Sequence, residues 1–204
     1  MKKLTMLLTA FLFSLSANAT LITVELNNTD YNVGDVLSAD IVISEIELDS
    51  TFQRIVGDFE FNLNFDNTVI DFISASFGDK LDVDPDPFWA SDQSIISSLG
   101  SVFLSEISYA LDSDLFFAQD GLTSFVLASI DFNVIGTGAS FVNLSEVAIG
   151  DAYGNDFLAV NAIGQTYSVK NGNSVGVPEP STVFLMLIAM VFFVIRQKHI
   201  KSSH

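Results

Sequence analysis

Few side chains in this 204-residue chain could carry out covalent or metal chemistry. It has no cysteine, and its two histidines, His199 and His204, stand at its end. Ser-His-Asp and Cys-His nucleophile systems and histidine-ligated zinc are therefore excluded from the rest of the chain. What remains are carboxylates, 25 Asp and Glu against 8 Lys and Arg. Because phosphate backbones are bound by clustered cations, this balance also argues against nucleic acid as a partner.

The acidic segment 82–87 is the best candidate for a metal site. Its carboxylates, Asp82, Asp84 and Asp86, recur at a spacing of two residues and offer the hard oxygen ligands that Ca²⁺ prefers. The segment is not an EF-hand, because Pro87 stands at the sixth position, where that loop has glycine, and Gln93 at the twelfth, where it has glutamate. We therefore predict a calcium site from ligand type alone, with a solvated acidic turn as the alternative.

Trp89 follows this segment directly, beside Phe88. A ring next to carboxylates is typical of sugar-binding sites, and a tryptophan can equally cap one end of a protein core. A glycosidase needs more, namely two carboxyl groups about 5–10 Å apart in a cleft. A chain with this many acids meets that distance by chance, so a carbohydrate-active enzyme is the least favoured function. No catalytic residue can be named.

The elements that position these residues have the two-residue period of β-strands. Residues 58–65 alternate polar and apolar side chains throughout, which gives a sheet one apolar and one wet face. Residues 124–134 alternate again, and this predicts that Val126, Ala128 and Ile130 point inward. Further strands are expected at 21–26, 36–43, 69–77, 102–108, 140–148, 158–162 and 166–170, with one short helix around 113–119. The pattern predicts an all-β protein, a two-sheet antiparallel, jelly-roll-like sandwich over residues 20–170.

The predicted sandwich is strongly acidic on its wet faces. Between Thr20 and Val177, 24 acids face three cations, Arg54, Lys80 and Lys170, a net charge of −21. Most of these acids alternate with apolar residues on the predicted strands, as a solvated sheet face requires. The core is assigned phenylalanines from several strands: Phe59, Phe61, Phe65, Phe72, Phe125 and Phe132.

The turn and strand rhythm of this body resembles that of cohesin modules. The resemblance is carried by Tyr31-Asn32-Val33-Gly34-Asp35 before a strand and by residues 57–66, 69–72, 125–132 and 150–155. It spans most of residues 21–170 and implies a jelly-roll-type sandwich. Cohesin modules of some bacteria bind dockerin modules, so the resemblance implies a dockerin-bearing protein partner as one possible function. No dockerin contact set can be transferred residue by residue.

Residues 1–19 have the pattern of a secretory signal peptide. Lys2 and Lys3 precede an apolar run over residues 4–15, and Ala17-Asn18-Ala19 supplies the small-x-small cleavage site. We predict that signal peptidase removes this segment, that the mature chain begins at Thr20, and that the protein is exported across the inner membrane.

The C-terminus contains a short apolar segment followed by cations. Residues 181–195 are uncharged and, as a helix, span about 22 Å against a hydrocarbon core of about 30 Å. The basic residues Arg196, Lys198 and Lys201 can snorkel to extend the span, and their position favours a cytoplasmic tail with the body outside. We predict one C-terminal transmembrane helix.

The triplet Pro178-Glu179-Pro180, the apolar helix and the basic tail 196–204 together resemble a PEP-CTERM sorting signal, preceded by a polar linker over 171–177. The resemblance implies processing by exosortase, a membrane cysteine protease, after transient anchoring in the inner membrane. It further implies delivery to the surface or extracellular matrix of an exopolysaccharide-producing bacterium. The leading function is therefore a non-enzymatic binding or structural sandwich, associated with exopolysaccharide. A cohesin-type module for a dockerin-bearing partner is the alternative.

Overall fold

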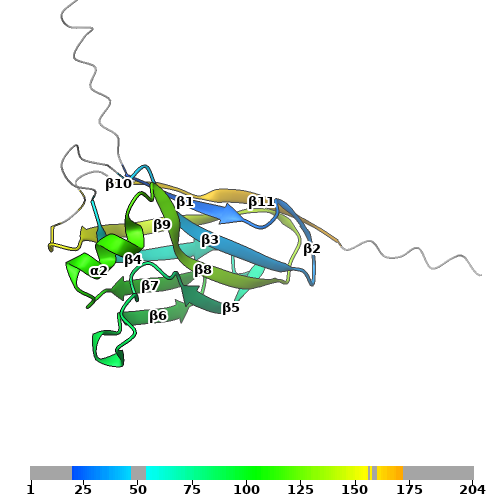
Figure 1. Ribbon diagram of the computed structural model, residues 1–204. Helices are drawn as coiled ribbons and strands as arrows, with labels where there is room; N and C mark the ends of the chain where they lie inside the picture. The colour runs from blue at the N-terminus through cyan, green and yellow to red at the C-terminus, as the bar shows by residue number, and fades with distance from the viewer. Residues whose placement is uncertain (1–19, 47–53, 156, 158–159, 172–204) are drawn as a thin grey trace, which may run out of the picture. The chain divides into compact units, whose positions relative to one another are not determined.

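The computed structural model describes residues 20–46, 54–155, 157 and 160–171 (Figure 1). The predicted signal peptide, the linker beyond Asn171 and the sorting signal lie outside this range. None of the described helices is long and apolar enough to cross a membrane, and the expected span at 181–195 is not among the described residues. The compact unit that contains the sandwich ends at Lys170.

The described chain is built almost entirely of strands, with the α-helix α2 (Asp112–Gln119) and the 3-10 helix η1 (Pro87–Trp89) as its helical elements. The strands are β1 (Thr20–Leu26), β2 (Asp30–Asn32), β3 (Val36–Ser44), β4 (Val56–Phe65), β5 (Ile70–Phe77), β6 (Asp92–Ser98), β7 (Ser101–Ile107), β8 (Ser124–Val134), β9 (Gly138–Asp151), β10 (Val160–Ile163) and β11 (Gln165–Lys170). The all-β prediction is confirmed, and α2 begins one residue before the expected helix.

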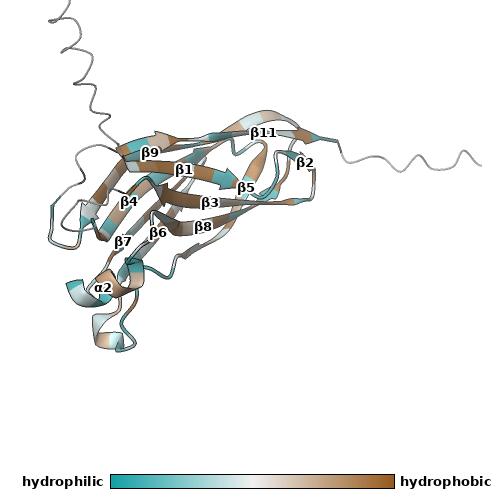
Figure 2. Cartoon of the chain, turned by 45° about the horizontal axis from the view of Figure 1, so that its top comes forward, coloured by the Kyte–Doolittle hydropathy of each residue, from teal (hydrophilic) through white to brown (hydrophobic). Residues whose placement is uncertain are grey.

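Two sheets form the sandwich (Figure 1). One has five strands in the order β10-β1-β3-β8-β5, and the other has six in the order β2-β11-β9-β4-β7-β6. Apolar and polar residues alternate along the strands (Figure 2), and the apolar side chains of both sheets meet in one core. Five of the six predicted phenylalanines belong to that core, and the sixth, Phe72, is partly buried and packs against it. All members of the core cluster come from residues 22–169.

The prediction that all strands pair antiparallel is wrong at two places. β10 runs parallel to β1, and β2 runs parallel to β11. β10 and β11 are consecutive, and at Gly164 between them the chain passes from the five-stranded to the six-stranded sheet. A side chain at Gly164 would collide with the carbonyl oxygen of Val142, so glycine permits this close crossing. Both sheets are therefore mixed.

The inward side of β8 differs from the simple alternation that the sequence predicts. Ala128 and Ile130 are buried as expected, but Val126 is half-buried while its neighbours Phe125 and Leu127 are in the core. A bulge explains this, because Ile41 of β3 pairs with Ala128 and the next residue of β3 pairs with Val126. Leu127 is the extra residue on β8. Before it, odd-numbered residues such as Phe125 point inward, and after it, even-numbered residues such as Ala128 and Ile130 do.

Two strands were not predicted from the sequence. Both β2 and β6 lie where no strand was expected. β6 is an edge strand that is exposed along nearly its whole length, so neither of its faces imposes the alternation by which a half-buried strand is recognised.

Candidate functional site

The three predicted calcium ligands each satisfy a backbone N–H of their own loop. Asp82 accepts from Ser91 N at 3.0 Å, and Asp84 accepts from Asp86 N at 2.8 Å. Asp86 accepts from Phe88 N at 3.0 Å and thereby caps η1. Among the described residues, no group of three or more His, Cys, Asp or Glu is placed to hold a metal ion. Calcium binding at this loop stays a prediction.

Trp89 does not cap the core. It is 43% exposed and stacks edge-to-face with Phe88, the ring centroids 5.1 Å apart, and Phe88 is itself 78% exposed. The pair stands on the η1 loop, outside the core cluster. The structure thus places the predicted acids and the aromatic pair in one solvated loop, without bringing them into a cleft of described residues.

The outer face of the six-stranded sheet gathers side chains that the strand pattern projects away from the core. On β4, Phe59, Phe61 and Leu63 are buried, so the residues between them point to the other side. These outward side chains are Asp58, Glu60, Asn62 and Asn64. The outward residues of β9, β7 and β6 continue this surface, among them Phe141 and Glu146 of β9, Ile107 of β7 and Ile96 of β6. We name this surface the docking face.

A polar ladder occupies the middle of the docking face. Asn62 Nδ2 donates to Glu146 Oε2 at 2.6 Å, and Asn64 Nδ2 donates to Ser145 Oγ at 2.8 Å. Glu146 has a φ of 52° and lies at a bulge, where β9 carries one more residue than β4. Non-glycine residues with positive φ are uncommon and mark positions that the surrounding structure holds in place. The bulge is therefore what aims Glu146 across at β4.

Exposed apolar side chains lie near this ladder, on β9 itself and on β6 and β7 beyond β4. Phe141 of β9 is 55% exposed, while Ile96 of β6 and Ile107 of β7 are 59% and 47% exposed. Ile96 pairs across the sheet with the half-buried Phe103, so the two form one apolar strip. Polar groups interleaved with uncovered aromatic and branched side chains are typical of protein-binding surfaces.

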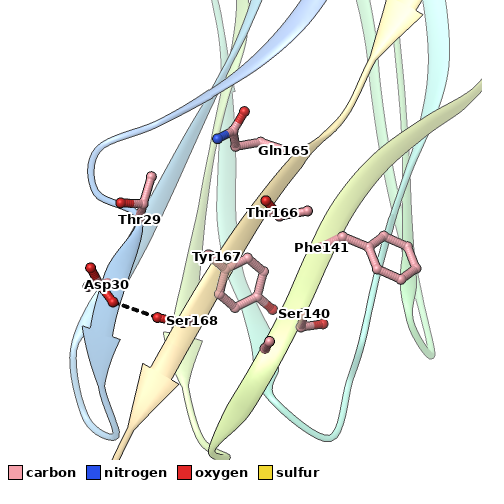
Figure 3. Close-up of a pocket in the computed structure, with 9 residues that line it drawn as sticks. Thr29, Asp30, Ser140, Phe141, Gln165, Thr166, Tyr167 and Ser168 are labelled. Carbon is pink, nitrogen blue, oxygen red and sulfur yellow. Dashed lines mark hydrogen bonds between the residues drawn. The ribbon is translucent and has the colours of Figure 1, made fainter.

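A shallow hollow of about 620 Å³ adjoins the docking face beside Phe141 (Figure 3). It lies over β2, β11 and β9 and is lined mainly by small polar side chains, including Thr29, Ser140 and Thr166. Asp30 at its rim accepts from Ser168 Oγ at 2.5 Å and pairs with Lys170 Nζ at 3.2 Å. The pKa of Asp30 lies below its ordinary value. The largest cause is the hydrogen bond from Ser168, and the hydrogen bond and positive charge of Lys170 add to it. The carboxylate therefore stays ionised at neutral pH.

One acid, Glu106, lies on the inner side of the sheet and was not singled out by the sequence. It is 1% exposed and accepts a hydrogen bond from Gln93 Nε2 at 2.8 Å. Burial raises the pKa of Glu106, and the nearby charge of Asp82 adds to the rise. The signal that could have revealed it is its position, since it continues the buried alternation of Val102 and Leu104.

Comparison with known proteins relates this architecture to cohesin modules. No family model and no curated protein matches the chain. Among solved structures, a non-cellulosomal cohesin of Archaeoglobus fulgidus aligns with a TM-score of 0.56 and 14% identity over 75% of this chain and 92% of its own. A type II cohesin of Acetivibrio cellulolyticus aligns with a TM-score of 0.59 and 16% identity over 73% and 95%.

A third similar structure, the sixth cohesin of scaffoldin B from Acetivibrio cellulolyticus, was solved in complex with a dockerin. Its TM-score is 0.56 at 15% identity, over 74% of this chain and 99% of its own. Identities this low establish the fold, and the expected cohesin-like sandwich is confirmed.

Proposed function

We propose that this sandwich is a non-enzymatic module that binds a dockerin-bearing protein through the docking face. The observation that carries the proposal is the composition of that face, a polar ladder with exposed apolar side chains near it. The fold similarity to cohesins, one of them solved with a dockerin, supports the choice of partner.

The charges of the docking face define the chemistry of the partner surface. Asp58, Glu60 and Glu146 all lie on it, so the face carries several negative charges. A partner that presents lysine or arginine opposite this ladder would neutralise these charges. Opposite charges also steer the encounter, so association should slow as salt concentration rises.

A binding role fits the side chains that are present better than catalysis does. The described residues include neither histidine nor cysteine, and the buried carboxyl of Glu106 accepts a hydrogen bond from the Gln93 amide. The outward acids of β4 lie on an open sheet surface instead of in a cleft that excludes water. The face can recognise a partner, but it lacks the paired acid and base that hydrolysis needs.

The two ends of the chain support a proposal about where the module works. The signal-peptide pattern of residues 1–19 and the Pro178-Glu179-Pro180 sorting pattern indicate export, transient membrane anchoring and release to the cell surface or matrix. Association with exopolysaccharide would then require divalent cations to bridge polymer and acidic sandwich. Matrix retention that is unchanged by a calcium chelator would contradict that bridging.

A charge-reversal pair tests the docking face directly. Glu60→Arg changes an exposed residue at the centre of the docking face, and Glu25→Arg makes the same change on β1 of the five-stranded sheet. Against purified dockerin-bearing proteins from the secreted fraction of the same organism, we expect Glu60→Arg to weaken binding by about tenfold or more. Glu25→Arg should change it less than about twofold. Absence of binding by the unaltered domain, or equal losses in both variants, would refute the proposal.

A further inference from the structure

The two sheets have four edges, and three of them are protected in ways that natural β-proteins use. β2 and β10 are short, with three and four residues. β5 carries a bulge between Phe72 and Ser74 and a charged residue, Asp71. β6 is less protected: its seven residues pair with β7 in unbroken register, contain no proline, lysine or arginine, and carry their single charge, Asp92, at the first position.

Two exposed apolar side chains stand at the centre of β6, one on each face of the sheet. Ile95 and Ile96 are 41% and 59% exposed, and Leu99 in the turn that follows is 89% exposed. On the side of β6 that faces away from β7, no described strand pairs with it. The N–H and C=O groups of alternate residues therefore point outward beside uncovered apolar side chains, which is a template for adding a strand.

A groove runs next to this edge. It has a volume of about 250 Å³ and lies between β5 and the turn from β6 to β7. Phe72, Ser97 and Leu99 are among the residues that line it. A strand added to β6 would have this groove beside it, where its side chains could contact Phe72 and Leu99.

We propose that the occupant of this edge is the β6 strand of a second copy of the chain, paired antiparallel so that two six-stranded sheets become one. Charge favours this arrangement. Two copies with 24 acids each repel over most of their surfaces, but β6 has a single charge, Asp92, at its first residue. Antiparallel pairing centred on Ile95 sets each Asp92 opposite Ser98 of the second copy, and the two aspartates lie at opposite ends. The uncharged stretch between them is where a second acidic copy can approach.

The dimer would place two docking faces side by side on one continuous sheet, because a two-fold axis normal to the sheet keeps the outward sides together. A bivalent module gains avidity toward partners that carry two binding units. This inference does not depend on the identity of the partner, since self-pairing is measured with no partner present.

The oligomeric state of the Thr20–Lys170 domain, which contains the whole core cluster, tests the proposal. Sedimentation equilibrium should show a concentration-dependent dimer. Ile96→Lys, which gives the edge the kind of charge that natural edges carry, should weaken dimerisation by about tenfold. Ile163→Lys changes a similarly exposed isoleucine (52%) on the β10 edge and should leave the dimer intact. A domain that stays monomeric, or equal effects of the two lysines, overturns the proposal.

A cross-linking measurement fixes the register. The chain has no cysteine, so a single introduced thiol can pair only with its copy. Ile95→Cys should form an intermolecular disulfide on oxidation, because self-paired residues across antiparallel strands have their Cβ atoms about 5 Å apart. Ile163→Cys serves as the control. Cross-linking through Ile163→Cys as readily as through Ile95→Cys overturns the assignment to β6, and circular dichroism verifies that each variant is folded.

Discussion

The two outer faces of the sandwich are both polar, yet they are built differently. On the five-stranded sheet, outward serines satisfy outward aspartates, with Ser38 Oγ 2.6 Å from Asp131 Oδ1 and Ser129 Oγ 2.5 Å from Asp40 Oδ1. On the six-stranded sheet, the polar ladder lies near uncovered apolar side chains such as Phe141. Acidity alone therefore does not distinguish the two faces. The five-stranded sheet also exposes apolar side chains, but Val36, Ile73 and Ile163 stand at the start of β3 and on the edge strands β5 and β10.

The comparison also separates residues that hold the fold from residues that meet a partner. Phe59 and Phe61 point inward from β4 and stack with centroids 5.6 Å apart, whereas Glu60 between them points outward. Substitutions one residue apart on this strand should therefore have unrelated effects. Measurements of stability and of binding can therefore separate the two groups of residues.

The largest effect is expected inside the sandwich. Phe61→Ala removes a fully buried ring and leaves a cavity, which should cost about 3–5 kcal/mol of unfolding free energy in denaturant titrations. Phe141→Ala removes a ring that is 55% exposed and should cost less than about 0.5 kcal/mol. Comparable losses of stability for the two substitutions would mean that Phe141 holds the fold together. The separation between structural and partner-binding residues would then be wrong.

The next effect concerns binding. Phe141→Ala should weaken partner binding by about 1–2 kcal/mol, because aromatic anchors contribute most of the energy of protein interfaces. Ile73→Ala on β5 changes a side chain that is 44% exposed in the other sheet and should leave the affinity unchanged. Isothermal titration calorimetry measures both. If Phe141→Ala left the affinity unchanged, Phe141 would not take part in partner binding.

A smaller effect is expected on the five-stranded face. Ser129→Ala deletes the hydroxyl that donates to Asp40, and the lost bond to a charged, half-buried group should cost about 1–2 kcal/mol of stability at most. Binding should not change, because the residue lies on the opposite face. If affinity fell instead, the two faces would not be independent.

The smallest and most condition-dependent effect concerns Glu106. Its pKa is raised in the folded protein, so its charged form opposes folding above that pKa, and this cost disappears as pH falls toward the unfolded-state value near 4.5. Glu106→Gln keeps the shape and removes the charge, so it should be more stable than the unaltered protein at neutral pH and equal to it in acid. Thermal melts from pH 7 to pH 4 measure the difference. A gap that widens in acid would reverse the sign and contradict the burial argument.

How much of this molecule the sequence predicts depends on how each residue is packed. Strands that are buried on one face, such as residues 58–65, can be predicted from the alternation of polar and apolar residues, because every second side chain enters the core. The edge strand β6 does not, because no layer covers either of its sides. The bulge at Leu127 could not be predicted, since an extra residue is accommodated by pairing with β3, which is not encoded locally.

The candidate site was less predictable than the fold. Asp82, Asp84 and Asp86 were predicted as a metal site because closely spaced acids resemble calcium ligands. In the structure, each of them accepts a hydrogen bond from a backbone N–H of the same loop. The docking face combines β4 with Phe141 and Glu146 of β9, which are about eighty residues further along the chain and meet β4 only through sheet order and a bulge. The outward pattern of β4 was visible in the sequence, but its neighbours were not.

The most direct test of the account is an NMR titration of the isotope-labelled Thr20–Lys170 domain with a purified dockerin-bearing partner. The account predicts that the amide shifts concentrate on the docking face, at Glu60, Asn62 and Phe141, and leave Ser38, Asp40 and Asp131 in place. Shifts that concentrate on the five-stranded face, or a partner that leaves both faces unperturbed, would contradict it.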